Sequence, residues 1–255
     1  MRGGTLCSKS GLVGGVDGVR GGWVMAATAV APESSLDILV FQSFSDLWSH
    51  AKRRDLLAVT VDIPTGLPGR EGRAADREAR GKLKPSEKGK RGRTSSVFPA
   101  PPLSSLGATT YKKAGELARR STDKGLTRQA FGLFPKIKEV RSALQPDDFE
   151  CGAVPRAAEV HPEVSFRFMA GSPMSFHKSL QAGVAERLSL LECHFPDIVD
   201  AAVRTSRTGP PHPGLDDVLD AVAAAWTARR LVQEEAARLG GCERDAAGYP
   251  MNIWA

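Results

Sequence analysis

The stretch LVGGVDGVRGGWVMAATAV, residues 12–30, decides the fold of this chain. Two apolar runs flank the turn VRGG at 19–22, so the pattern predicts a strand at about 12–17, a tight return, and a second strand at about 22–30. Asp17 is the one charged residue in the first run. A strand at this position would hold its carboxylate at a fixed point at the strand's end.

The next segments extend this beginning into a sheet. LDILVFQSF at 36–44 has alternating Leu36, Ile38 and Val40, which predicts a third strand. Ser45 is expected to cap a helix over 45–54. LLAVTVDI at 56–63 is nearly unbroken in hydrophobicity and predicts a fourth strand, buried on both faces, with Asp62 at its end.

Residues 68–115 interrupt this regular order with a basic run and a Pro- and Ser-rich segment. Beyond the interruption, the pattern predicts short helices, a fifth strand, an amphipathic helix and an Ala-rich helix, at about 111–143, 157–160, 179–195 and 216–239 respectively. The expected order is therefore β-β-β-α-β-insertion-β-α-α. It predicts an α/β fold with three antiparallel strands extended by parallel ones and helices on both faces.

Length and composition indicate how the chain is organised. With 255 residues and 41% hydrophobic residues, we expect a disordered leader at 1–10 and a single domain at 11–255, with a basic, Pro-rich and helical insertion at about 68–150. The apolar runs are shorter than the roughly 20 residues of a membrane span, so no membrane partner is expected. The four cysteines are scattered, which disfavours structural zinc, and without an export signal a reducing cytoplasm is the expected location.

The net charge of +6 is concentrated in one segment. REGRAADREARGKLKPSEKGKRGR at 70–93 is rich in Lys and Arg and could follow a phosphate backbone, or it could be a solvated insertion. Composition alone leaves both interpretations open.

Four carboxylates are the strongest chemical signal. Asp17 and Asp62 lie at strand ends, and Asp217 and Asp220 open the Ala-rich helix with a spacing that puts both on one face. Carboxylates gathered together repel one another, so such clusters normally require divalent metal. Taken singly, Asp17 could instead shape a turn and Asp217 could be a helix N-cap. As a set, the four acids indicate metal-assisted phosphate chemistry.

The layout of these acids resembles that of the RNase H-like superfamily, and within it the Holliday-junction resolvase (RuvC-like) branch, whose last helix carries a DxxDA pattern. The chain as a whole resembles the domain of unknown function 429 family, which is labelled a predicted nuclease with an RNase H fold. The resemblance extends from about residue 13 to 252. The segments that carry it are GVDGVRGGWV (15–24), VDIPTGLP (61–68), RAADREAR (73–80), SSVFPAPP (95–102), FPKIKEV (134–140), EVHPEVSF (159–166) and DDVLDAVAAAWTARR (216–230).

The resemblance implies a nuclease that hydrolyses phosphodiester bonds, with two Mg²⁺ or Mn²⁺ ions about 4 Å apart between the carboxylates. It assigns metal ligation to Asp17, Asp62, Asp217 and Asp220, and Glu159 on the expected fifth strand would add a further catalytic carboxylate. The candidate substrate-binding residues are Arg73, Arg77, Arg80, His161, Glu163 and Lys178. The implied partner is nucleic acid, either DNA or RNA. Resolvases commonly act as dimers, so a homodimer is compatible with this reading.

Three other functions share these features. A sugar-kinase or actin-type phosphotransferase begins with a similar Asp-Gly turn, but such folds normally duplicate the domain. A second alternative is a catalytically inactive RNase H-like module that binds nucleic acid or protein. A third keeps the metal chemistry but acts on nucleotides or small phosphoesters, with the Pro-rich segment closing a small pocket.

Overall fold

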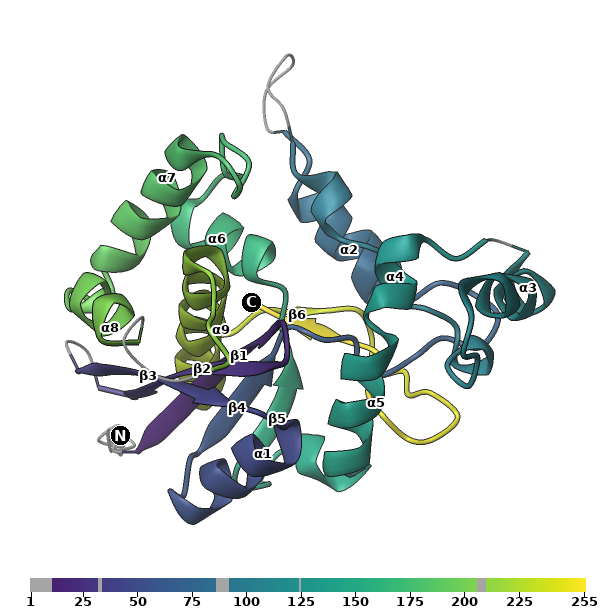
Figure 1. Ribbon diagram of the computed structural model, residues 1–255, viewed down its shortest axis with the longest axis horizontal. Helices are drawn as coiled ribbons and strands as arrows, with labels where there is room; N and C mark the ends of the chain where they lie inside the picture. The colour runs from purple at the N-terminus through teal and green to yellow at the C-terminus, as the bar shows by residue number, and fades with distance from the viewer. Residues whose placement is uncertain (1–10, 32–33, 86–91, 124, 206–209) are drawn as a thin grey trace, which may run out of the picture.

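The computed structural model describes residues 11–31, 34–85, 92–123, 125–205 and 210–255 (Figure 1). The expected leader at 1–10 and part of the basic run, residues 86–91, lie outside the described residues. Within the described residues, no helix has the length and apolar character needed to cross a bilayer.

A five-stranded mixed sheet forms the centre of the fold, in the order β3-β2-β1-β4-β5. The first three strands are antiparallel, and β4 and β5 continue the sheet parallel to β1. This is the predicted α/β architecture, and it is compatible with an RNase H-like fold. The strands are β1 (Leu12–Val19), β2 (Gly22–Ala29), β3 (Leu36–Phe41), β4 (Ala58–Val61) and β5 (Arg156–Glu159).

Helices cover both faces of this sheet (Figure 1). On one face lie α1 (Phe44–Arg53) and α5 (Phe134–Ala143), whose apolar residues pack with Trp23 and Met25 of β2. Val24 and Ala26 of the same strand point to the other face, as the period of two requires. The helices of that second face are α6 (Pro162–Ala170), α7 (Gln181–Glu192), α8 (Ile198–Thr205) and α9 (Leu215–Val232).

Helix α9 packs unusually close to β1, and Gly15 is the reason. A Cβ placed on Gly15 would lie 1.9 Å from the backbone nitrogen of Ala225 and 2.3 Å from the carbonyl oxygen of Ala221. A hydrogen bond of 2.8 Å from the Thr60 hydroxyl to the Ala224 carbonyl ties the same helix to β4. These contacts hold the middle of α9 against β1 and β4, directly after Asp220 in the chain.

The insertion between β4 and β5 is mostly helical, as predicted. It comprises α2 (Ala74–Lys82), α3 (Tyr111–Thr122), α4 (Arg128–Gly132) and α5, with short 3-10 turns at Thr94–Ser96, Leu103–Ser105 and Pro146–Phe149. Figure 1 shows α2, α3 and α4 extending away from the sheet on the side of its β5 edge, opposite β3.

Several predicted boundaries were wrong. The third strand ends at Phe41 rather than 44, and α1 begins at Phe44, so Ser43 and not Ser45 is its N-cap. The Ser43 hydroxyl accepts a hydrogen bond of 3.1 Å from the Asp46 backbone amide, which Ser45, inside the first turn, is not placed to do. The Ala-rich helix ends at Val232 rather than 239, and Arg238–Leu239, expected within it, instead form β6, which pairs with β7 (Ile253–Trp254). Sequence patterns also missed α8 and β7.

Candidate functional site

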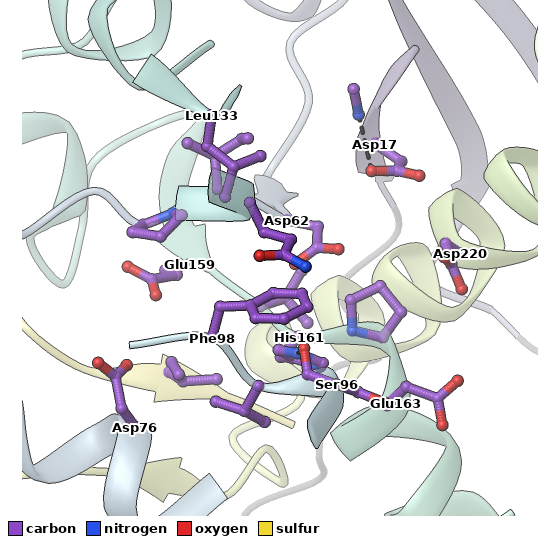
Figure 2. Close-up of a pocket in the computed structure, with 18 of the residues that line it drawn as sticks. Asp17, Asp62, Asp76, Ser96, Phe98, Leu133, Glu159, His161, Glu163 and Asp220 are labelled. Carbon is purple, nitrogen blue, oxygen red and sulfur yellow. Dashed lines mark hydrogen bonds between the residues drawn. The ribbon is translucent and has the colours of Figure 1, made fainter. Parts of the chain in front are cut away.

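A cavity of about 560 Å³ lies where the carboxyl ends of β1, β4 and β5 meet. Parallel strands place their carboxyl ends at one edge, which is where ligands of α/β proteins commonly bind. The start of α6, the second turn of α9 and the Ser95–Phe98 part of the insertion complete the walls. Figure 2 shows acidic side chains entering this cavity from several elements.

Asp17 and Asp62 lie side by side because of the strand register. Val16 pairs with Val61, and the Asp62 backbone amide donates a hydrogen bond of 3.0 Å to the Val16 carbonyl. The next residue of each strand therefore points to the face that α9 covers. Asp220, one turn into α9, completes a group of three carboxylates at this wall of the cavity.

These three carboxyl groups resist ionisation. Burial raises the pKa of Asp17 well above its usual value, and the neighbouring charges of Asp62 and Asp220 raise it further. Burial likewise raises the pKa of Asp62, and it raises the pKa of Asp220 to about 7. The site thus concentrates more negative charge than the surrounding protein compensates.

Lys178, from the loop between α6 and α7, partly compensates this charge. Its Nζ lies 2.6 Å from Oδ2 of Asp220. Burial opposes the charged ammonium, but Asp220, Asp17 and Asp62 outweigh that effect and raise the pKa of Lys178. The other oxygen of Asp220, Oδ1, is buried and has no hydrogen-bond partner among the described residues. Lys178 therefore pairs with one oxygen of this carboxylate, Oδ2, and leaves the other without a partner among the described residues.

Asp217 occupies a different place from Asp220, although both open the same helix. Its Oδ2 accepts a hydrogen bond of 2.8 Å from the backbone amide of Gly214, the N-cap residue, so it stabilises the first turn of α9. Asp217 does not line the cavity. Its negative charge nevertheless contributes to the raised pKa of Asp17. Of the two acids that sequence analysis offered, Asp220 is the one that enters the site.

Glu159 points away from this group, because it pairs with Val61 and so projects from the opposite face of the sheet. Its two oxygens are 2.7 and 2.8 Å from the guanidinium of Arg73, and it also accepts a hydrogen bond of 2.8 Å from the Thr65 amide. Arg73 is 3% exposed and also binds Asp76. Both charged groups of this pair are fully engaged within the protein.

The remaining predicted arginines lie outside the cavity. Arg77 is exposed and donates to the Gly72 carbonyl, and Arg80 donates a hydrogen bond of 2.9 Å to the Val97 carbonyl. Together with the buried Arg73, these residues do not form a shared cationic face toward the carboxylates. The helical spacing that grouped them is real, but each guanidinium donates to a backbone carbonyl of the protein itself.

His161 and Glu163, at the start of α6, do line the cavity. The Nε2 atom of His161 is 3.2 Å from the Ser96 carbonyl, while its Nδ1 is buried without a partner among the described residues. Glu163 accepts a hydrogen bond of 3.1 Å from Nε of Arg187, and its Oε2 is buried and similarly unpartnered. Three polar side chains at the cavity, those of Asp220, His161 and Glu163, thus each have one buried atom without a hydrogen-bond partner in the described part of the chain.

Sequence reasoning missed most of the other side chains that line this cavity, and four of them are charged or aromatic residues at its edge or surface. Lys136 of α5 lies 4.0 Å above the Trp23 ring and donates to the Gly22 carbonyl, and Arg93 joins the insertion to the α6–α7 loop. Phe98 and His177 are exposed to the cavity. Lys136 and Phe98 lie within the motifs FPKIKEV and SSVFPAPP, whose positions relative to the acids no sequence pattern reveals.

Among the described residues, no three His, Cys, Asp or Glu side chains are already gathered in a group that could hold a metal ion. The donor set nonetheless suits a hard cation, since Mg²⁺ and Mn²⁺ prefer carboxylate oxygens. The unpartnered Oδ1 of Asp220 and the raised pKa values beside it show where positive charge is lacking. The carboxylates would have to approach one another when a cation binds.

Comparison with known proteins gives one match. The family described as "Protein of unknown function (DUF429)" matches residues 15–244, which include every residue of the site discussed above. No curated protein and no solved structure matches the chain.

Proposed function

We propose that this chain, which belongs to the DUF429 family, is a nuclease that hydrolyses phosphodiester bonds with the help of divalent metal ions. The family description names no chemistry, so the proposal rests on the site. The residues that would act are Asp17, Asp62 and Asp220, which come from three elements and line one cavity. The sheet order, compatible with an RNase H-like fold, supports the same proposal.

The observation that carries the proposal is the state of Asp220. Its side chain is 3% exposed, yet Oδ1 has no hydrogen-bond partner among the described residues and its pKa is raised to about 7. A buried carboxylate without a full set of partners is destabilising by about 1–3 kcal/mol or more. Proteins retain such groups where function requires them, and a carboxylate beside two others is suited to binding a cation.

Asp17, Asp62 and Asp220 would hold the metal, and Glu163, whose Oε2 is unpartnered, lies at the same cavity as a further oxygen donor. Bound Mg²⁺ or Mn²⁺ would supply a Lewis acid and a water of lowered pKa. Lys178 would leave Asp220 and neutralise a phosphate oxygen, since its ammonium already lies at the carboxylates. Glu159 and Arg73 would keep the insertion fixed against β5.

Calorimetric titration with Mn²⁺ and Mg²⁺ tests the proposal directly. We expect the unaltered protein to bind, Asp220→Asn and Asp17→Asn to lose most of the affinity, and Asp37→Asn, an exposed acid on β3, to bind as the unaltered protein does. The same proteins would be incubated with single-stranded, duplex and junction DNA and with RNA. Cleavage that requires metal and is lost in Asp220→Asn supports the nuclease. An unaltered protein that binds neither metal, with or without nucleic acid, would refute it.

A further inference from the structure

Contacts between distant segments join the walls of the cavity beside the carboxylates. The Ser96 carbonyl is 3.2 Å from His161 Nε2, and Arg93 donates hydrogen bonds of 3.2 and 2.6 Å to the carbonyls of Met174 and Ser175. The insertion is therefore bonded to His161 and to the α6–α7 loop at this cavity. A volume of about 560 Å³ lies within the range of roughly 300–1,000 Å³ typical of small-ligand pockets.

Phe98 lies in this cavity with an exposed aromatic ring. Its side chain is 40% exposed, although nearby Val97 is buried and several other apolar residues line the same wall. Figure 2 shows the ring turned toward the region where Asp62 and His161 lie. An aromatic face left open beside a polar reaction site is a platform on which a nucleobase can stack.

Cations and apolar side chains both line the cavity. The Lys178 ammonium lies at the carboxylates, and Lys136 lines the same cavity from α5. Phe98, Leu133 and Pro64 are apolar residues of the lining. This combination suits a nucleotide, whose phosphate is charged and whose base has an apolar face.

We infer that the substrate enters this site as an unpaired nucleotide, with its base stacked on Phe98 and its phosphate directed to Lys178 and the carboxylates. The inference rests on the proposed function and specifies its substrate class. Both faces of a base inside a duplex are covered by its neighbours, so a paired nucleotide cannot stack on Phe98 unless it is first extruded. The nucleotide is either free or an unpaired residue of a strand.

Binding of a fluorescent mononucleotide, 2-aminopurine riboside 5′-monophosphate, in Mg²⁺ tests the inference without turnover, because this probe has no phosphodiester bond. We expect stacking to quench its fluorescence. Phe98→Ala should weaken binding about 5- to 150-fold, as loss of one stacked base does, and Phe98→Tyr should retain it. The matched control is Phe176→Ala, since Phe176 is 48% exposed and does not line the cavity. Its affinity should equal that of the unaltered protein.

Competition identifies the source of the nucleotide. A nuclease-resistant phosphorothioate single strand should displace the probe, and the same strand in a perfect duplex should not. If the single strand displaces the probe at a lower concentration than free nucleotide does, the substrate is a strand. If free nucleotide displaces the probe at the lower concentration, the substrate is a free nucleotide. No probe binding, equal affinity in Phe98→Ala, or equal competition by the duplex would each overturn the inference.

Metal titration of Phe98→Ala separates this result from the proposed function, because Phe98 has no oxygen donor. Metal binding that depends on Asp220, without any effect of Phe98 on nucleotide affinity, leaves the nuclease standing and removes the unpaired-nucleotide inference. Nucleotide binding that depends on Phe98, without metal binding, removes the metal-dependent nuclease and leaves the binding of an unpaired nucleotide standing.

Discussion

Replacing Asp220 by Asn should make the metal-free protein more stable at alkaline pH. Asn has nearly the shape of a protonated aspartic acid and removes the buried charge that the site fails to compensate. Burial raises the pKa of Asp220 from 3.8 to about 7, even though Lys178 acts in the opposite direction. The rise is therefore the net effect of the site on the charged form, with the lysine included.

The sign follows from proton binding. Between pH 3.8 and about 7 the folded protein holds a proton on Asp220 that the unfolded chain releases, so the stability contributed by this group falls as pH rises through that window. Above pH 7 the full penalty, about 4 kcal/mol, is present. At pH 4.5 it is about 1 kcal/mol. The gain from Asp220→Asn should thus be large at pH 8 and small at pH 4.5.

Urea unfolding in EDTA at both pH values measures this difference. A gain of up to about 4 kcal/mol at pH 8 corresponds to roughly 8–16 °C in Tm for a chain of this size. Asp37→Asn, on the exposed side of β3, should change stability by less than about 0.5 kcal/mol. Added Mg²⁺ should stabilise the unaltered protein but not Asp220→Asn. A variant that is no more stable at pH 8, or equally stabilised at both pH values, would refute the reasoning.

Three other substitutions test the structure around the site, each by urea unfolding. Arg73→Ala should lower the free energy of unfolding by about 3–5 kcal/mol because it leaves buried carboxylates unpaired. The control Arg77→Ala, at an exposed position of α2, should lower it by less than about 0.5 kcal/mol. Equal losses of stability in the two variants would contradict the buried ion pair. Lys178→Met should destabilise the metal-free protein by about 1 kcal/mol at pH 8 and less at pH 4.5, and a loss that does not depend on pH would argue against its pairing with a titrating carboxylate. Gly15→Ala should cost more than about 3 kcal/mol of stability or prevent folding. The control Gly14→Ala, whose new methyl group would meet only the flexible side chains of Leu56 and Met25, should cost about 1–3 kcal/mol. A folded and stable Gly15→Ala would show that α9 does not pack as described.

The sequence predicted the sheet well because its strands can be recognised from their runs of apolar residues. β4 is continuous in Ala and Val because both its faces are covered, and β2 alternates large side chains between two helical layers. The ends of elements were harder to predict. Ser43 and Ser45 are equally good caps in composition, and only the backbone conformation of Ser43, φ −131° and ψ 153°, distinguishes them.

The site was predictable only in part, because a spacing in sequence does not reveal which face of an element meets the cavity. Asp217 and Asp220 share a helix face, yet the first is held by the Gly214 amide and the second reaches the cavity. Glu159 is the last residue of β5, and the pleat of the strand directs it to the face opposite Asp62, where it pairs with Arg73. His161 lies beyond the strand as the N-cap of α6, so its direction is set by that helix.

The same packing that builds the core also brings the carboxylates of the site close enough to repel one another. Gly15 lets α9 approach β1 until their backbones nearly touch, and this closeness carries Asp220 to the end of the strand that bears Asp17. A bulkier residue at 15 would hold the helix away and relieve the repulsion between those carboxylates. A fold selected for stability alone would have no reason to pair a glycine in a central strand with a buried acid on the helix above it. The combination is explained if the strand and helix are held together so that the carboxylates can share a cation.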